Sequence, residues 1–320
     1  PAGMRDGVNY TSVVTATLVL TAPEKQFVYV IGDFNNWEVE PNFYMKRTPD
    51  GQKYWLELTG LAPALEYAYQ YLVDGTIRVA DPYAEKILDP WNDRFIPAST
   101  YPGLKPYPTG KTTNIVSVLQ TAQAQYQWQV TNFRKPKIED LVFYELLIRD
   151  FTTLRTYKSI QDTLSYFKRL GVNALKIMPV MEFEGNESWG YNPMFMFAPD
   201  KYYGTKNDLK RLIDEAHKQG IAIILDIVLN HQFGNSPLVR MYWDALNNRP
   251  AANSPWFNTV ARHPFNVGFD MNHESQFTRD FSDRVIEHWI TEYKVDGYRF
   301  DLSKGFTQVN SGGDVGLWGR

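Results

Sequence analysis

The sequence predicts a two-part chain, in which an immunoglobulin-like β-sandwich precedes the first half of an eight-stranded (β/α) barrel. Residues 12–80 alternate apolar and polar side chains in short segments separated by turn residues, which is typical of antiparallel strands. From residue 138 onward, strand-like segments alternate with segments of helical period, which indicates a parallel sheet covered by helices. We therefore expect a β-sandwich over residues 1–110, a connection over 111–137 and half of a barrel over 138–320.

The first part contains four segments with strand character. They are SVVTATLVL (12–20), QFVYVIG (26–32), QKYWLEL (52–58) and EYAYQYLVDG (66–75). The dipeptides Asp50-Gly51 and Asp74-Gly75 are typical of hairpin turns. Residues 81–137 are rich in proline and aromatic side chains, and the run NIVSVL within them predicts one more strand. Because helical periodicity is absent before residue 80, we expect a small antiparallel domain.

The second part contains apolar strand segments separated by helical ones. The strand segments are LVFYELLI (141–148), NALKIMPV (173–180), IAIILDIVLNH (221–231) and VDGYRFD (295–301). The helical segments are 159–171, 205–220 and 280–294, with Ser159 and Thr205 as expected N-caps and Gly171 and Gly220 at the C-terminal ends. The range 138–320 is shorter than the roughly 250 residues of a closed barrel, so these strands account for half of one.

The composition excludes several classes of function. A net charge of −3 over 320 residues provides no basic surface, so we expect no nucleic-acid partner. The absence of cysteine excludes disulfides and thiolate chemistry, and with only 5 histidines the sequence indicates no zinc cluster. No apolar run is long enough for a membrane span. The chain starts with PAGMRDG, which has no signal-peptide character, and it stops soon after NSGGDVG, so we expect a fragment.

An arginine and an aspartate occur two residues apart in VDGYRFDLSKG (295–305). Strand geometry places Arg299 and Asp301 on one face and Tyr298 and Phe300 on the other. Asp301 ends the strand, at the position where barrel enzymes carry catalytic residues. A guanidinium beside a carboxylate favours its ionised form and can orient it, as a nucleophile requires. A structural ion pair at a strand end remains the alternative for these two residues considered alone.

A second polar group ends an apolar strand segment at DIVLNH (226–231). Asp226 interrupts the apolar run and therefore needs a buried partner, for which Arg299 on the neighbouring strand is the candidate. His231 can donate a hydrogen bond to a substrate hydroxyl, and Asn230 can hold a loop or a hard cation. An ordinary Asn-His turn remains the alternative.

Aromatic side chains are concentrated in SWGYNPMFMFAPDKYYGT (188–205), the segment after the second barrel strand. Tyr191 follows a glycine and precedes Asn-Pro, so we expect a rigid turn that presents its ring at the catalytic rim. Such a ring, and Trp189 beside it, is a natural platform for a sugar. For most rings of this segment, packing within the loop is the alternative explanation.

These segments resemble the conserved blocks of the α-amylase superfamily (glycoside hydrolase family 13) of retaining α-glucan-active enzymes. WGYNP, DIVLNH and GYRFDLSKG occur in the order typical of that family, and YELLIRDF (144–151) resembles its first barrel strand. GDFNNW (32–37), YQYLVDG (69–75) and ADPYA (80–84) look like the glycogen-binding-type (CBM48-like) sandwich that precedes the barrel in branching and debranching members. The resemblance covers nearly the whole chain.

The resemblance implies a role for each residue that matches a family motif. Asp301 matches the catalytic nucleophile, and Arg299 matches the arginine that positions it. Asp226 matches the invariant structural aspartate of the block on the third barrel strand, and it is a candidate substrate-binding residue. His231 matches the histidine that binds the sugar at the cleaved bond, and Tyr191 matches the tyrosine that stacks under that sugar.

Three further positions follow from the same resemblance. Trp189 and Lys304 are candidate substrate-binding residues. Asn230 matches a position that ligates calcium in many members, so a structural calcium is a candidate, although the reaction itself requires no cofactor. Asp270 or Asp244 would supply the carboxylate of such a site.

The sequence departs from the family pattern in several places. Gly305 replaces a common histidine but can still supply the carbonyl used at the calcium site. Trp37 matches one glycogen-contacting tryptophan, whereas TIRV (76–79) replaces the second, so a domain that only supports the barrel is the alternative. The family's general acid, a glutamate on the fifth barrel strand, has no counterpart here, and Glu145 and Glu182 match no family position.

The resemblance implies a retaining glycoside hydrolase that cleaves starch-type or glycogen-type α-glucans. Asp301 is the expected nucleophile, and the acid/base is expected to be a glutamate that lies beyond this fragment. The fragment alone is expected to be inactive and to need the complementary C-terminal fragment of the same barrel. The alternatives are a glucan-branching enzyme of the same family, a non-catalytic glucan-binding protein, and a metal-dependent barrel enzyme with Asp226 and Asp301 as ligands. The compartment is not determined, although polymeric substrates slightly favour a secreted or periplasmic location over a cytoplasmic one.

Overall fold

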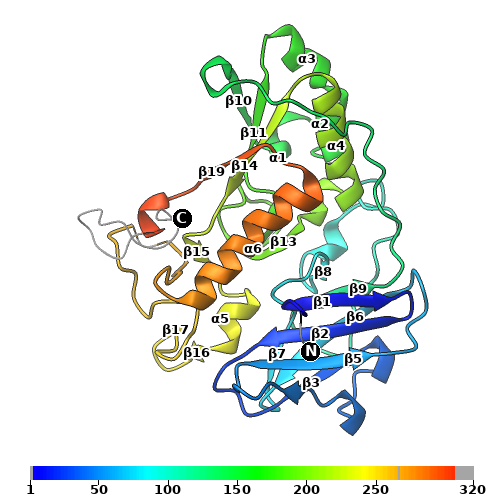
Figure 1. Cartoon of the computed structure of the whole chain (residues 1–320), viewed down its shortest axis with the longest axis vertical. Helices are drawn as coiled ribbons and strands as arrows, with labels where there is room; N and C mark the ends of the chain where they lie inside the picture. The colour runs from blue at the N-terminus through cyan, green and yellow to red at the C-terminus, as the bar shows by residue number, and fades with distance from the viewer. Residues whose placement is uncertain (1–2, 266, 307–320) are drawn as a thin grey trace.

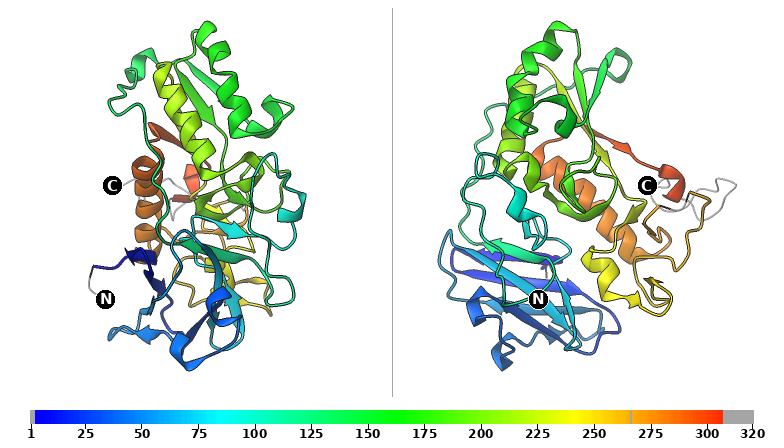
Figure 2. Two further views of the ribbon diagram at one scale, coloured as in Figure 1. Left: turned by 90° about the vertical axis from the view of Figure 1, so that its right-hand side faces the viewer. Right: turned by 180° about the vertical axis from the view of Figure 1, so that it is seen from behind.

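The computed structural model describes residues 3–265 and 267–306. A β-rich N-terminal region occupies one end of the molecule, and a parallel sheet with helices packed on it occupies the other (Figures 1 and 2). None of the helices within these ranges is both long enough and apolar enough to span a membrane. The NSGGDVG segment and the end of the chain, which the sequence singled out, lie outside the described residues.

The N-terminal region consists of two antiparallel sheets. Its strands are β1 (Gly7–Ser12), β2 (Thr15–Thr21), β3 (Val28–Gly32), β4 (Lys46–Arg47), β5 (Lys53–Leu58), β6 (Glu66–Val73), β7 (Ile77–Val79), β8 (Ile87–Leu88) and β9 (Val116–Gln120). One sheet has the order β1-β2-β5-β4, and the other has the order β3-β6-β9-β8 with β7 paired to β6. Each strand segment predicted before residue 120 contains an observed strand, because the alternating apolar residues line the core.

Two details of this region follow from local chemistry and pairing. The turn between β6 and β7 holds Asp74 and Gly75 at positive φ (50° and 73°), which is the backbone of the predicted tight hairpin turn. Strand β9 lies beyond the expected boundary at residue 110 but hydrogen-bonds to β6 and β8. The β-rich region therefore extends to Gln120.

The second part is built on a parallel sheet whose strands follow the order of the chain. They are β10 (Phe143–Leu146), β11 (Ala174–Ile177), β14 (Ala222–Ile227) and β19 (Gly297–Phe300). All neighbouring pairs are parallel, which is the arrangement predicted for the first strands of a barrel. The register sets Asp226 of β14 directly opposite Arg299 of β19.

Helices connect and cover these strands. They are α1 (Ile148–Phe151), α2 (Tyr157–Asp162), α3 (Leu164–Arg169), α4 (Lys206–Lys218), α5 (Pro237–Met241) and α6 (Gln276–Tyr293), with 3₁₀ helices η1 (Asp33–Asn35), η2 (Pro41–Phe43), η3 (Asp93–Phe95), η4 (Ile138–Asp140), η5 (Lys201–Tyr203) and η6 (Ser303–Phe306). The predicted N-cap at Thr205 is confirmed, because its side chain accepts a hydrogen bond from the backbone of Asp208. The prediction of one helix over 159–171 capped by Ser159 is wrong. Thr156 caps α2 and Ser159 completes the capping box, so the helix starts earlier, and it is interrupted at Thr163.

Helix α6 buries the apolar stripe that the sequence predicted. Phe281, Val285, Trp289 and Tyr293 are all fully buried. Trp289 also donates a hydrogen bond from its indole nitrogen to the carbonyl oxygen of Met196, at 2.8 Å. The stripe thus attaches α6 to the segment that follows β11.

Two long excursions leave the C-terminal ends of the central strands. After β11 the chain forms the hairpin of β12 (Met181–Phe183) and β13 (Pro193–Pro199). After β14 it forms β15 (His231–Gln232), α5, β16 (Trp243–Asp244), β17 (Arg249–Pro250) and β18 (Phe269–Asp270). In this second excursion α5 packs against β7 of the N-terminal region (Figure 1). Both excursions therefore lie at the end of the sheet where barrel sites form.

Candidate active site

One hydrogen-bonded network joins the C-terminal ends of β14 and β19 to the loop before β13. It contains the residues that the sequence singled out, namely Tyr191, Asp226, His231, Arg299 and Asp301. The two strands are adjacent in the sheet (Figure 1), so residues 73 positions apart in the chain come into contact. This is the location that the barrel prediction gave for a catalytic site.

Arg299 holds two carboxylates at once. Its Nη1 donates to Oδ1 of Asp301 at 2.6 Å and to Oδ1 and Oδ2 of Asp226 at 3.0 and 3.1 Å. Burial opposes the charged guanidinium, but the hydrogen bonds to Asp226 and Asp301 outweigh it and raise the pKa of Arg299. Within the described residues, Oδ2 of Asp301 accepts no hydrogen bond. One oxygen of Asp301 is therefore fixed, while the other is available.

Asp226 is a fully buried carboxylate with two donors. Besides Arg299, it accepts a 2.8 Å hydrogen bond from the hydroxyl of Tyr191. Burial raises the pKa of Asp226, and the hydrogen bonds from Tyr191 and Arg299 oppose that effect. The buried partner that the sequence required for Asp226 is thus present, and the strand register provides it.

Tyr191 is held in place by its backbone as well as by its hydroxyl. The preceding Gly190 has φ 89°, and a β-carbon there would lie 2.6 Å from the carbonyl oxygen of Pro179. Only glycine fits this close approach, which confirms the tight turn expected before Tyr191. Burial, and then the negative charge of Asp226, raise the pKa of Tyr191, so the hydroxyl remains a donor to Asp226.

His231 has a hydrogen-bond partner at each ring nitrogen. Its Nε2 donates to the carbonyl oxygen of Tyr191, and its Nδ1 accepts from Nδ2 of Asn230, both at 2.8 Å. This pattern corresponds to the neutral ring, and burial lowers the pKa of His231 in agreement with it. A hydrogen bond from His231 to a sugar would replace the one to Tyr191, so its substrate contact stays a prediction.

Two other candidates for substrate binding lie close to the network in the chain. Trp189 precedes Tyr191 by two residues, and 59% of its surface is exposed. Lys304 lies in η6, three residues after Asp301, and is partly buried. The exposed indole of Trp189 has a ring face available to a ligand, but the roles of both residues in binding stay predictions.

Asn230, the expected calcium ligand, carries a buried amide oxygen that accepts no hydrogen bond from the described residues. A β-carbon at Gly305 would lie 1.3 Å from this oxygen and 3.1 Å from Nε2 of His263. The space beside the Asn230 amide therefore accepts only glycine at residue 305. This explains the departure from the family pattern at that position in steric terms.

The two acidic residues expected to complete a calcium site with Asn230 already accept hydrogen bonds. Asp270, on β18, is near it through the pairing of β15 with β18, whereas Asp244 accepts hydrogen bonds from its own turn, including one from Asn247 at 2.6 Å. Asp270 already accepts a hydrogen bond from His263 at 3.0 Å. Within the described residues, no three His, Asp or Glu side chains converge in a way that could hold a metal. Calcium binding therefore stays a prediction.

His263 was missed by sequence reasoning, although the structure places it between Asp270 and Gly305. Its segment, ARHPFN, has neither helical nor strand periodicity, so no sequence signal indicated that it would be buried. Only the folding of the second excursion brings His263 next to Asp270 and Gly305.

The carboxylates without a family match have structural partners. Glu145 forms an ion pair with Lys176 on the neighbouring strand, at 2.9 Å. Glu182 is buried and pairs with Lys201 at 2.5 Å, and Lys201 also reaches Asp93 at 3.3 Å. Burial raises the pKa of Glu182. These ion pairs support the sequence-based decision not to assign either glutamate as the general acid.

Trp37, the residue that matched a glycogen-contacting tryptophan, is part of a core. Only 7% of its surface is exposed, and it belongs to an apolar cluster with Ile31 and Leu72. Its indole nitrogen donates to Asp33 at 3.1 Å. In this position the ring stabilises the β-rich region and has almost no face available to a glycan.

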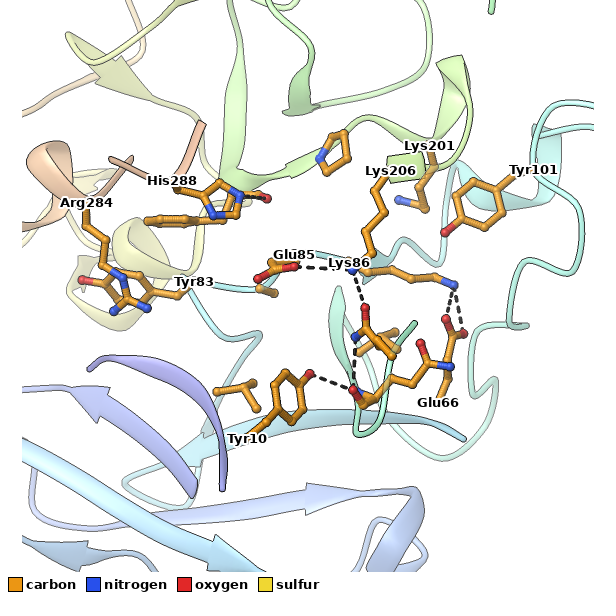
Figure 3. A pocket seen from close by; sticks show the side chains of 17 residues that line it. Tyr10, Glu66, Tyr83, Glu85, Lys86, Tyr101, Lys201, Lys206, Arg284 and His288 are labelled. Carbon is orange, nitrogen blue, oxygen red and sulfur yellow. Dashed lines mark hydrogen bonds and ion pairs between the residues drawn. The ribbon is translucent and has the colours of Figure 1, made fainter. Parts of the chain in front are cut away.

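A polar cavity of about 120 Å³ lies between the N-terminal region and the parallel-sheet part (Figure 3). None of the network residues lines it. Its lysines have acidic partners: Lys86 pairs with Glu66 at 2.7 Å, and Lys206 approaches Glu85 at 3.6 Å. Lys201, the third lysine of the lining, pairs with Glu182, and Arg284 donates to the backbone carbonyl oxygen of Asp6.

Comparison with known proteins gives the network a family context. Residues 150–268, which include Tyr191, Asp226 and His231, match the sequence model described as alpha amylase, catalytic domain. This part of the chain is related to the α-amylase catalytic domain. The parallel strands β11 and β14 and both excursions begin within the matched range.

Individual relatives match the chain on both sides of residues 150–268. A malto-oligosyltrehalose trehalohydrolase from Saccharolobus solfataricus is 35% identical over 228 residues, covering 70% of this chain and 36% of that protein. A 1,4-alpha-glucan branching enzyme from Clostridium perfringens is 28% identical over 311 residues, covering 93% and 43%. The structure of GBS pullulanase SAP in complex with maltotetraose has a TM-score of 0.68 at 21% identity, over 93% of this chain and 42% of that one. The last likeness concerns the fold, and this chain spans less than half the length of each of the three.

Proposed function

We propose that the protein containing this sequence is a retaining glycoside hydrolase that acts on α-glucans, with Asp301 as its nucleophile. The observation that carries the proposal is the 2.6 Å hydrogen bond from Arg299 to one oxygen of Asp301, which leaves the other oxygen available. A carboxylate nucleophile has to be ionised and oriented, and an adjacent guanidinium does both. The relationship to the α-amylase catalytic domain supports the same reaction class.

The proposed reaction has two displacements. In the first, Oδ2 of Asp301 attacks the anomeric carbon, the glycosidic C–O bond breaks, and the leaving oxygen takes a proton from a carboxylic acid. In the second, water attacks the same carbon, the bond to Asp301 breaks, and the acid regains a proton from the water. Asp226 is an unsuitable acid, because it is fully buried and bonded to Arg299 and Tyr191. We assign the acid to the glutamate that the family resemblance implies on a fifth barrel strand.

The substrate class rests on the printed names of the relatives. A trehalohydrolase acting on malto-oligosyltrehalose and a 1,4-alpha-glucan branching enzyme both point to starch-type or glycogen-type chains. The branching enzyme supports a second candidate function, in which a glucan hydroxyl replaces water in the second displacement. Hydrolysis releases one new reducing end per cleaved bond, whereas branching releases none, so reducing-end assays with iodine staining distinguish the two.

The test of the proposal is Asp301→Asn in the protein that contains this sequence, assayed on starch, glycogen and pullulan. We expect loss of glucan cleavage with retained folding, because Asn keeps the shape but cannot form the glycosyl-enzyme. Asp162→Asn is the matched control, since Asp162 forms an exposed ion pair with Lys158 on α2. Unchanged cleavage by Asp301→Asn rejects the nucleophile, and glucan binding without any cleavage by the wild type favours a non-catalytic glucan-binding protein.

We also propose that further β/α units pair with the two edges of the parallel sheet. Within the described residues, β10 and β19 each have one neighbour in that sheet. Phe143 on β10 is 53% exposed, and Val142 beside it is also exposed. An uncovered strand with apolar side chains favours association. Hydrogen exchange of the β10 and β19 amides tests whether these edge strands are paired. Rapid exchange in the complete protein would show that neither edge is paired.

A further inference from the structure

Two arginines without a carboxylate partner meet where the second excursion packs against the N-terminal region. Arg240 lies on α5 and Arg78 lies on β7, and these two elements are in contact (Figure 1). Both side chains line one cavity of about 420 Å³. The Nε atom of each is buried and has no hydrogen-bond acceptor within residues 3–265 and 267–306. Neither arginine forms an ion pair in that part of the chain.

This arrangement is unfavourable as long as no anion is present. A buried donor without an acceptor loses its hydration, and two guanidinium groups at one cavity repel each other. Burial lowers the pKa of Arg240, and no acidic group opposes that shift. An anion that accepts hydrogen bonds from both arginines would remove the desolvation cost and the repulsion together.

The other charged groups around the cavity leave it positive. Lys25 is a third lining cation, but it is already engaged, 4.0 Å from Asp74 and 4.4 Å from the centre of the Tyr242 ring. No Asp or Glu belongs to the described lining. Glu24, near Lys25 in the chain, accepts a hydrogen bond from Asn253 at the edge of the cavity. The excess positive charge therefore belongs to Arg78 and Arg240.

The contrast with the cavity of Figure 3 shows that this charge is not a general property of the interface. There, each of the three lysines Lys86, Lys201 and Lys206 has a carboxylate nearby, at 2.7, 2.5 and 3.6 Å. Both cavities lie between the same two parts of the chain, but the cavity of Figure 3 has acidic lining residues, whereas the described lining of the second cavity has none. A cationic cavity with no internal counter-charge is the arrangement expected of an anion site.

The uncharged lining indicates what else the ligand carries. Thr76, Asn114 and Trp243 contribute a hydroxyl, an amide and an indole ring. Hydroxyls and amides bond sugar hydroxyls, and an aromatic face packs against a sugar ring. The volume is within the range of small-molecule sites.

We propose that this cavity binds a phosphorylated saccharide, with Arg78 and Arg240 holding the phosphate oxygens and Trp243 and Asn114 contacting the sugar. Guanidinium groups recognise phosphate through paired N–H donors, which suits two arginines facing one group. The site is separate from Asp301, so this inference stands or fails independently of the proposed nucleophile.

Binding is tested with inorganic phosphate, glucose 6-phosphate and glucose, by calorimetry and by thermal shift at low ionic strength. We expect glucose 6-phosphate to bind at least about 10-fold more tightly than inorganic phosphate, and glucose not to bind. Equal affinity for inorganic phosphate and glucose 6-phosphate would overturn the saccharide part of the proposal. Absence of binding by both phosphate compounds would overturn all of it.

Variants separate a binding role from a structural one. Arg240→Gln and Arg78→Gln should each weaken glucose 6-phosphate binding at least about 10-fold, because a charge-assisted contact is lost. Neither should lower the melting temperature without ligand, since each removes a partly buried charge that forms no ion pair within the described residues. Arg169→Gln, on α3, is the control and should bind normally. Undiminished binding in both cavity variants, or a lower melting temperature with unchanged affinity, rejects the site.

Discussion

Arg299 and Arg240 are arginines in two opposite situations within one chain. Arg299 lies between Asp226 and Asp301 and donates to both of them, whereas Arg240 faces a cavity with no acceptor for its buried Nε in the described residues. Strand pairing creates the first arrangement, and the packing of α5 on β7 creates the second. The pKa of Arg299 is raised by its carboxylate partners, and the pKa of Arg240 is lowered by burial.

The difference shows that an arginine with carboxylate partners can position those carboxylates, whereas an arginine without them can bind a ligand. A guanidinium with two carboxylates fixes the positions of those groups, as a catalytic nucleophile requires. A guanidinium without an internal partner keeps its donors for an external ligand. Local sequence does not separate the two cases, because each is a single arginine in a mostly apolar segment, PLVRM for Arg240 and GYRF for Arg299. Only the elements that pack beside them do so.

The sharpest way to break this comparison is to remove each guanidinium in turn. Arg299→Met leaves the fully buried Asp226 without its cation, so we expect the free energy of unfolding to fall by about 3 kcal/mol or more. Arg240→Met should change it by less than about 1 kcal/mol. Urea denaturation of both variants at neutral pH measures the difference. Equal destabilisation by the two changes would mean that Arg240 has a structural partner after all.

A second test concerns the space behind the nucleophile. In Gly305→Ala the added β-carbon meets the buried amide of Asn230, which is itself bonded to His231. We expect a loss of about 1–3 kcal/mol in unfolding free energy, measured by thermal or urea denaturation. Gly234→Ala is the control, because the nearest atom to its β-carbon would be 3.9 Å away. Equal melting temperatures for the two variants would show that the Asn230 amide can move at little cost.

A third test concerns Asp200, a buried carboxylate whose hydrogen bonds come from backbone amides, at 2.8 Å from Tyr202 and 3.5 Å from Phe183. Burial raises the pKa of Asp200 from its ordinary value of 3.8 to about 7. The folded protein thus keeps a proton that the unfolded chain loses. This contribution to stability is fully present below about pH 4 and is lost as the pH rises to about 7.

Asp200→Asn should remove that pH dependence. We expect the difference in unfolding free energy between pH 4 and pH 7 to shrink by up to about 3 kcal/mol relative to the wild type. Denaturation curves at several pH values measure it, with Asp162→Asn as an exposed control. Identical pH profiles for the wild type and Asp200→Asn would show that Asp200 is ionised in the folded state throughout this range.

The sequence alone determined the order of the elements and much of the site. Alternating strands, helical stripes and caps depend on residues close together in the chain, so β5, β6, α4 and α6 could be predicted from local patterns. Arg299 and Asp301 could be placed together because they are two residues apart on one strand. The helix predicted over 159–171 was wrong at its start, because Thr156 and Ser159 form a capping box that the apolar pattern does not reveal, and the observed helix is interrupted at Thr163.

Only the tertiary structure decided which distant residues meet. The register of β14 and β19 joins Asp226 to Arg299, and the turn at Gly190 directs Tyr191 onto Asp226. Burial of Trp37 removed a glycan contact that its motif suggested. The meeting of Arg78 with Arg240 depends on how an excursion folds back on another part of the chain. The physical reason is common to all of these: local periodicity encodes which face of an element is buried, but not which side chain lies opposite it.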